Sequence, residues 1–198
     1  MTLEDEKSAQ RSRGKAARRA LTDAQRTAAN DALCRRLLAL KTVRDARTIL
    51  VYAAFGAEAD VAAFAAAMQQ QGKAVAYPVC GEGFTLTAAV PDADGWETGA
   101  YGIRAPVLSR SRIVAPDELD LVLVPCTAFD ADCGRIGMGK GYYDRYLPQC
   151  THAVKLGVAF EVQRVAKAAL GPYDQRLDAF VTEGGYYCGN GKFDALDL

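Results

Sequence analysis

The sequence predicts an α/β fold with three layers, α/β/α: a mostly parallel, Rossmann-like sheet with helices on both faces and a basic N-terminal helical arm. Short apolar segments alternate with helical segments along the chain, as they do in βαβ units with parallel strands. Several of these segments lack polar alternation, which is typical of strands buried on both faces. The 198 residues are enough for one compact domain. No linker divides them, so residues 1–198 are expected to form a single domain.

The chain begins with the predicted arm. Residues 1–14 are polar and are expected to be disordered or frayed. Helices are predicted over residues 15–21 and 22–40. A break between them is expected because Thr22 and Gln25 have the spacing of a capping box.

The sheet is predicted from short apolar segments. These cover residues 48–55, 73–79, 84–90, 119–125, 153–160 and 177–183. The segment 119–125 is the most apolar of them and is expected at the centre of the sheet. The segment 84–90 alternates, as a more exposed strand or hairpin arm does, and 177–183 is expected to be the last strand.

Helices are expected between these strands. They cover residues 60–72, which Gly72 would close as a C-cap, residues from 141 onward, and residues 161–170. Residues 91–118 are rich in Pro, Gly and Asp and are expected to be mostly loop.

Charge and cysteine usage limit the class of protein. Up to Arg47, twelve Lys and Arg stand against six Asp and Glu, and the rest of the chain has the opposite excess. A basic segment of this kind could meet nucleic acid or phosphates, or could be a solvated helical face. The six cysteines show no C-x-x-C pair and no metal-like spacing. Scattered cysteines of this kind favour a reducing compartment.

Targeting signals are not recognisable. No apolar segment approaches the ~18 residues that a membrane span needs, and the first ten residues lack the apolar core of a secretory signal. A cytoplasmic location is therefore expected, with no membrane partner.

The segment GRIGMGKGYYDRYL, residues 134–147, resembles part of a P-loop. Gly134, Gly139 and Lys140 match its first positions, but Gly141 stands where a P-loop needs Ser or Thr to help hold Mg²⁺. Residues 126–133 also separate the predicted strand from Gly134, whereas a P-loop follows its strand more directly. The P-loop interpretation is therefore weak.

The segment nevertheless contains the residue types that bind phosphate. Gly137, Gly139 and Gly141 alternate, so the backbone can approach a ligand closely and its N–H groups can form an anion nest. Arg135 and Lys140 supply positive charge for phosphoryl oxygens. The alternative is a glycine-rich turn whose nearby acidic residue stabilises a helix start.

The longer segment LVLVPCTAFDADCGRIGMGKGYYDRYL, residues 121–147, resembles the signature of the 5-formyltetrahydrofolate cyclo-ligases. KAARR, GAEADVAAF, LGVAFEVQ and DQRLDAFVTE resemble further segments of that family. The chain departs from the family pattern in three places. Gly134 directly precedes Arg135, Ala105 replaces a Glu in GAYGIRAP, and Tyr173–Asp174 replaces a His–Asp pair.

The resemblance implies an ATP-dependent ring closure with Mg²⁺. ATP would phosphorylate the formyl oxygen of 5-formyltetrahydrofolate, and the N10 amine would then attack the activated carbon. Phosphate would leave, giving 5,10-methenyltetrahydrofolate, ADP and phosphate. Such a reaction asks mainly for positioning and charge neutralisation, which glycines, cations and carboxylates can supply.

The resemblance also implies site residues. ATP would be bound by Lys15, Arg18, Arg19, Arg135, Gly137, Met138, Gly139, Lys140, Gly141, Tyr142 and Tyr143. The folate would be bound by Ala53, Glu58, Met138, Gly139, Lys140, Gly141 and Tyr142. The catalytic residues would be Lys140, Arg135 and Tyr143, and Mg²⁺ would be held by Asp144 and Asp178.

Several of these residues have a structural alternative. Lys15 and Arg19 could be charges on a helix surface, and Glu58 could begin a helix without touching a ligand. Asp178 could end a loop before a strand, and Tyr142 could belong to the core.

Residues outside the segment 134–147 offer few groups suited to catalysis or metal binding. His152, the only histidine, lies outside it, and an exposed or hydrogen-bonded role is expected. Cys126 and Cys133 have no paired histidine or metal partner in the sequence and are interpreted as structural.

Other functions fit part of the sequence. A binding module for a phosphorylated metabolite or RNA, or a kinase acting on another small molecule, could use the same sheet and glycine segment. Nucleic acid is not the expected partner, because the basic residues are not interleaved with aromatics and the net charge is zero. The expected assembly is a monomer or weak homodimer.

Overall fold

A computed structural model describes residues 2–99 and 102–188. The strands of its main sheet are β1 (Thr48–Leu50), β2 (Ala74–Cys80), β3 (Leu86–Pro91), β6 (Ser111–Val114), β7 (Leu121–Pro125), β10 (Val154–Val158), β11 (Ala179–Val181) and β12 (Tyr186–Cys188). Two small pairs stand apart: β4 (Trp96–Thr98) with β5 (Arg104–Pro106), and β8 (Ala128–Phe129) with β9 (Arg135–Ile136). The α-helices are α1 (Leu3–Arg19), α2 (Asp23–Ala39), α3 (Lys41–Asp45), α4 (Ala62–Gln70) and α5 (Tyr142–Tyr146).

The main sheet has eight strands in the order β12-β11-β10-β7-β1-β2-β3-β6. The five inner strands from β11 to β2 pair in parallel. The outer pairings, β11 with β12, β2 with β3 and β3 with β6, are antiparallel. The predicted mostly parallel sheet is confirmed, and β7, from the most apolar segment, lies among the inner strands.

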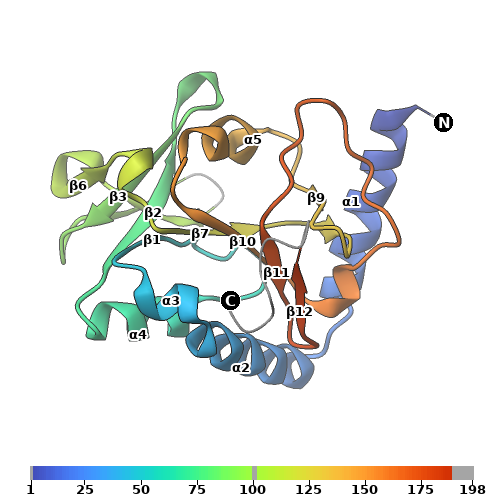
Figure 1. Cartoon of the computed structure of the whole chain (residues 1–198), viewed down its shortest axis with the longest axis horizontal. Coiled ribbons are helices and arrows are strands. Elements are labelled where there is room, and N and C mark those ends of the chain that lie inside the picture. Colours follow the sequence, from blue (N-terminus) through green and yellow to red (C-terminus); the bar gives the residue numbers. More distant parts are fainter. Residues whose placement is uncertain (1, 100–101, 189–198) are drawn as a thin grey trace.

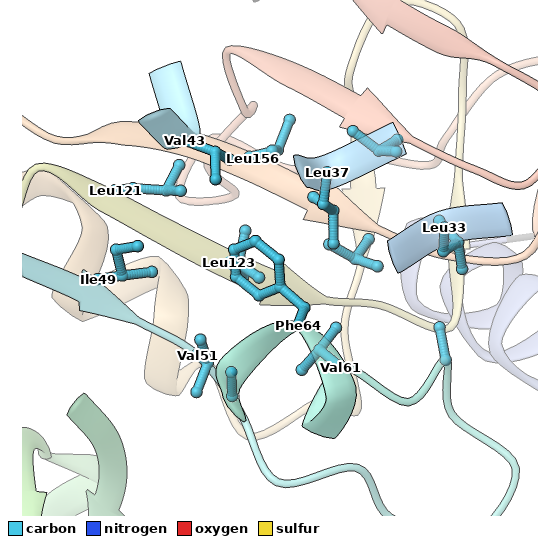
Figure 2. Packing of buried hydrophobic residues seen from close by; sticks show 14 of the residues in the cluster. Leu33, Leu37, Val43, Ile49, Val51, Val61, Phe64, Leu121, Leu123 and Leu156 are labelled. Atoms are coloured by element: carbon cyan, nitrogen blue, oxygen red, sulfur yellow. The ribbon is translucent and has the colours of Figure 1, made fainter. Parts of the chain in front are cut away.

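Helices cover both faces of this sheet, as predicted. In Figure 1, α2 and α4 lie on one side of the strands and α5 lies on the other. Alternate residues of β7 point to the two sides: Leu121 and Leu123 join one apolar cluster, and Val122 and Val124 join the other. Figure 2 shows the first cluster, where Phe64 of α4 packs beside Leu123.

The expectation of disorder or fraying is wrong for residues 2–14, and Met1 lies outside the described residues. Residues 3–14 belong to α1, whose N-cap Thr2 forms a capping box with Asp5. The helix also docks on the body, where Gln10 binds the Lys167 carbonyl and the Ala169 N–H. These tertiary contacts stabilise a segment whose polar composition alone suggested disorder.

The predicted helix over 161–170 is also wrong. Only a 3-10 turn, η6 (Glu161–Gln163), forms there, and the following backbone is irregular. Its N–H groups find partners outside any helix: Val165 N donates to Phe129 O, and Ala168 N donates to the Asp130 carboxylate. Tertiary hydrogen bonds therefore replace the helical ones.

Three smaller expectations need correction. Residues 91–118 hold β4, β5 and β6 as well as loops, and β12 follows the strand expected to be last. β1 is shorter than the predicted 48–55, because the chain leaves the sheet after Leu50. Ala100 and Tyr101, in the segment that contains Ala105, lie outside the described residues.

Other local predictions are confirmed. Thr22 and Gln25 form the capping box that opens α2, and Gly72 follows α4 with φ of 77°. No helix in the described ranges has both the length and the apolar character needed to cross a membrane.

Candidate active site

The candidate site begins where β7 ends. After Pro125 the chain forms the β8–β9 hairpin and then the glycine segment, residues 137–141, which leads into α5. Helix α1 lies beside β9 (Figure 1). In open α/β sheets, ligands bind beyond the carboxyl ends of the strands, so the glycine segment stands where a ligand is expected.

The alternating glycines serve two purposes. Gly139 and Gly141 have φ of 99° and 71°, a region that favours glycine. A Cβ on Gly137 would lie 2.9 Å from Nη1 of Arg135, so this glycine makes room for the guanidinium below it. Lys140, between the two positive-φ glycines, is exposed.

Arg135 lies beneath this segment. The residue is 4% exposed, and its Nη2 donates to Oδ1 of Asp144 over 2.7 Å. Its buried Nε has no hydrogen-bond partner among the described residues. Since leaving a buried donor unpaired costs about 1–3 kcal/mol or more for a charged group, this N–H fits an anionic ligand.

Asp144 is held from two sides. Its Oδ1 accepts from Arg135 and also from the backbone N–H of Gln175, over 3.2 Å. Asp144 and Gln175 line an open hollow of about 470 Å³ together with Gly141, Arg145, Pro172, Tyr173 and Asp174. The glycine segment and Asp144 therefore border one space.

Asp178 precedes β11 at the amino ends of the parallel strands, whereas the glycine segment follows the carboxyl end of β7. Its Oδ2 accepts the backbone N–H of Lys155 over 2.8 Å, next to the start of β10. No recorded contact joins it to Asp144, and no cluster of three or more potential ligands from His, Cys, Asp and Glu occurs within residues 2–99 and 102–188. The structure favours the alternative in which Asp178 precedes a strand, while its metal role remains a prediction.

The two tyrosines of α5 differ. Tyr142 packs edge-on against Phe84 of η1 (Glu82–Phe84), with ring centroids 5.9 Å apart. The hydroxyl of Tyr143 is buried without a hydrogen-bond partner in the described part of the chain. Burial, and then the charge of Glu58, raise the pKa of Tyr143, so its hydroxyl is neutral near pH 7.

Glu58 lies in the loop after β1, which also carries Ala53. Its Oε2 accepts the backbone N–H of Phe55 over 3.0 Å, and its Oε1 is 3.5 Å from Nη1 of Arg18. Burial raises the pKa of Glu58, whereas the Phe55 N–H and the Arg18 charge oppose that rise. Glu58 and Arg18 thus form a second polar group, which α1 connects to the contact between Arg11 and the glycine segment.

Helix α1 presents different cations from those expected. Arg19 is exposed and Lys15 is half-buried, with no recorded hydrogen bond or ion pair. Arg11 instead reaches the glycine segment: its Nε donates to Gly137 O over 3.2 Å, and its guanidinium carbon lies 3.5 Å from where a Gly139 Cβ would be. Arg11 was missed by the sequence analysis.

Lys7 was missed as well. It pairs with Asp174, which lines the hollow. Lys7, Arg11, Gly14 and Arg18 follow one another at intervals of three or four residues, which places them on one face of a helix. That periodicity was the available signal.

The comparisons with known proteins show the family of this chain. The family model described as "5-formyltetrahydrofolate cyclo-ligase family" matches residues 3–183. The 5-formyltetrahydrofolate cyclo-ligase of Haemophilus influenzae is 31% identical over 152 residues, which cover 73% of this chain and 80% of the relative. The enzyme of that name from Escherichia coli K12 is 29% identical over 170 residues, covering 83% and 93%.

Solved structures extend the match to the fold. The 5,10-methenyltetrahydrofolate synthetase of Aquifex aeolicus superposes with a TM-score of 0.83 at 26% identity, covering 95% of each chain. A structure of the synthetase from Mycoplasma pneumoniae, at 24% identity and a TM-score of 0.73, supports the fold alone. With the family model spanning nearly the whole described chain, this protein belongs to the 5-formyltetrahydrofolate cyclo-ligase family.

Proposed function

We propose that the protein catalyses the ATP-dependent cyclisation of 5-formyltetrahydrofolate to 5,10-methenyltetrahydrofolate, with release of ADP and phosphate. The observation that carries this proposal is that α1 contacts two polar groups: the glycine segment with its cations, and Glu58. Arg11 and Arg135 lie against Gly137, Lys140 belongs to the glycine segment, and Arg18, on the same helix as Arg11, pairs with Glu58. The reaction needs this arrangement, because the formyl oxygen must meet the phosphoryl group that it accepts.

The phosphate side is assigned to the glycine segment with its cations. Arg11 contacts Gly137 O from above, and Arg135 lies below with a buried Nε that lacks a partner among the described atoms. Lys140 adds an exposed charge between Gly139 and Gly141. Phosphoryl transfer depends on such positioning and charge neutralisation rather than on a protein nucleophile.

The folate side is assigned to the loop after β1 and to the start of α5. Glu58 can accept two parallel N–H bonds from a pterin ring, and its Arg18 contact at 3.5 Å leaves acceptor capacity on Oε1. Tyr142 and the half-buried Ala53 would border the ring, and Met138, shortly before Tyr142 in sequence, is exposed. A bound folate would offer the Tyr143 hydroxyl a hydrogen-bond partner that the described residues do not supply.

Magnesium is proposed to bind at Asp144. Mg²⁺ binds carboxylate oxygens together with substrate phosphates, and when bound it would neutralise phosphate charge. The recorded hydrogen bonds of Asp144 all fall on Oδ1, which fixes the side chain beside the hollow. Asp178 is retained as the second proposed ligand, although its Oδ2 already accepts a backbone N–H.

We also propose that the protein is a cytoplasmic monomer or weak homodimer. Cys34, Cys80, Cys126 and Cys150 are thiols in the structure, which suits a reducing compartment. Size-exclusion chromatography with light scattering at micromolar concentration tests the assembly, and a tight oligomer would contradict it.

The activity is tested with purified protein, MgATP and 5-formyltetrahydrofolate. The expected result is the ATP-dependent appearance of the near-ultraviolet absorbance of methenyltetrahydrofolate, together with stoichiometric ADP. Reactions without ATP, and reactions with 5-methyltetrahydrofolate, which lacks the formyl oxygen, serve as controls. Absence of an ATP-dependent signal from folded protein would refute the assignment, and retention of RNA at moderate salt would favour a binding module.

A further inference from the structure

Arg18 contacts Glu58, on the side of the site that we assign to the folate. Its side chain is 6% exposed, and its Nη1 lies 3.5 Å from Glu58 Oε1, whose side chain is 10% exposed. The same Nη1 donates to Cys126 O over 3.3 Å, next to the end of β7. The resemblance implied that Arg18 binds ATP, but its partners in the structure are Glu58 and the backbone carbonyl of Cys126, just after β7.

The surroundings of Glu58 make this partner important. The groups that interact with its charge are Arg18, Lys15, Tyr52, Tyr143 and Cys126. The two tyrosines and the thiol are neutral near pH 7, since burial raises the pKa of each, that of Cys126 to about 12. Only the two cations among these groups offset the burial of the carboxylate.

We propose that Arg18 is a positioning residue for folate recognition: it holds Glu58 ionised and oriented so that both carboxylate oxygens can accept N–H groups of the pterin. This inference rests on the proposed function. The Cys126 carbonyl anchors the guanidinium at one end, and the Phe55 N–H fixes the other oxygen of Glu58. The carboxylate is therefore held between a cation from α1 and the backbone of its own loop.

The chemical consequence follows from proton uptake. Without Arg18, the main opposing charge is lost, and burial would raise the Glu58 pKa further. A protonated carboxyl carries a donor where the pterin N–H groups need an acceptor. Folate binding should then weaken at neutral pH and recover as pH rises through the raised pKa, because the carboxylate is again ionised above it.

The experiment compares Arg18→Met, Arg18→Lys and Arg13→Met by steady-state kinetics from pH 6 to 9. Arg13 is exposed on the same helix and controls for loss of one charge. Arg18→Met should raise KM for 5-formyltetrahydrofolate about tenfold at pH 7, because a protonated Glu58 loses the charge-assisted hydrogen bonds that it accepts from the pterin. That KM should fall again toward pH 9, while KM for ATP changes less than about twofold. In Arg18→Lys, KM for the folate should return most of the way to that of the unmodified protein.

A second variant covers the case in which Arg18→Met does not fold. Arg18→Met with Glu58→Gln removes both buried charges, and its KM for the folate should equal that of Glu58→Gln alone, with no recovery at high pH. An additive loss in the double variant would overturn the proposal, because Arg18 would then act independently of Glu58.

The other possible results of these measurements also test the role of Arg18. If Arg18→Met leaves KM for the folate unchanged, or raises it by the same factor at every pH, the positioning role is wrong. If KM for ATP rises instead, Arg18 contacts the nucleotide. The proposed function fails separately, when the unmodified protein forms no methenyl product from MgATP and 5-formyltetrahydrofolate.

Discussion

Replacing Gly14 with alanine tests whether the docking of α1 builds both sides of the site. Gly14 lies inside α1, and a Cβ there would lie 1.8 Å from Thr127 O and 2.8 Å from Thr127 C. Real Cβ contacts stay above 3.0 Å, so the helix would have to withdraw by roughly 1.2 Å, the difference from 1.8 Å. Both atoms belong to the backbone, which cannot rotate away.

The sign of the effect is diagnostic. In an unobstructed helix, alanine is more favourable than glycine by about 1 kcal/mol. Overpacking a rigid interior costs about 1–3 kcal/mol, and withdrawal of α1 would also strain the hydrogen bonds of Gln10. We expect a net loss of about 2 kcal/mol, which lowers Tm by about 4–8 °C in a chain of this size.

The assay combines thermal unfolding with the two Michaelis constants. Arg11 and Arg18 flank Gly14 on the docked face, so KM for ATP and KM for the folate should both rise. Gly185→Ala is the matched control, because a Cβ there meets nothing within 4 Å. A higher Tm with unchanged Michaelis constants for Gly14→Ala would show that α1 does not pack on Thr127 as described.

Three further changes test single contacts. Lys140→Ala should lower turnover by about 100-fold through loss of a charge at the transferring group; near-normal turnover would make Lys140 a surface residue. Asp144→Asn should shift the Mg²⁺ titration to higher concentration, and an unchanged titration would place the metal elsewhere. Asp174→Asn removes the charge that pairs with Lys7, in side chains that are only 14% and 20% exposed; it should cost about 1–3 kcal/mol of stability, whereas unchanged urea unfolding would mean that this pair does not anchor α1.

The sheet and the glycine segment were predictable because their signals are local. The apolar run that became β7 needs burial on both faces, and its residues alternate between the two clusters. Positive φ at Gly139 and Gly141 follows from the absence of a side chain. These features depend on residues adjacent in sequence, so no knowledge of distant contacts was required.

The irregular segment after β10 could not be predicted in this way. Residues 161–170 contain good helix formers, but the backbone there is satisfied by groups far away in sequence. Ala169 N donates to Gln10, and Ala168 N donates to Asp130. Propensity is a weak prior, and these contacts exist only once α1 and the β8–β9 hairpin have docked.

The cations of α1 show a further limit of prediction from the sequence. The spacing Lys-x-x-x-Arg occurs twice, at Lys7 with Arg11 and at Lys15 with Arg19. The two copies are eight residues apart, a rotation of only about 80° on a helix. Local sequence therefore does not show which of the two Lys–Arg pairs lies at the glycine segment. That depends on how α1 docks, which Gly14 permits by letting the helix contact the Thr127 backbone.

The docking of α1 should couple the binding of ATP to the binding of the folate. Arg11 and Arg18 are seven residues apart, which places them about 10 Å apart along a rigid helix. One contacts the glycine segment and the other contacts Glu58. Because the helix cannot shift under one of them without moving the other, changes in α1 docking should alter ATP and folate binding jointly. A change at Lys140, which belongs to the glycine segment instead, should spare the Arg18–Glu58 pair. Joint and separate effects on the two Michaelis constants therefore distinguish the helix from the loop as the element that aligns the two substrates.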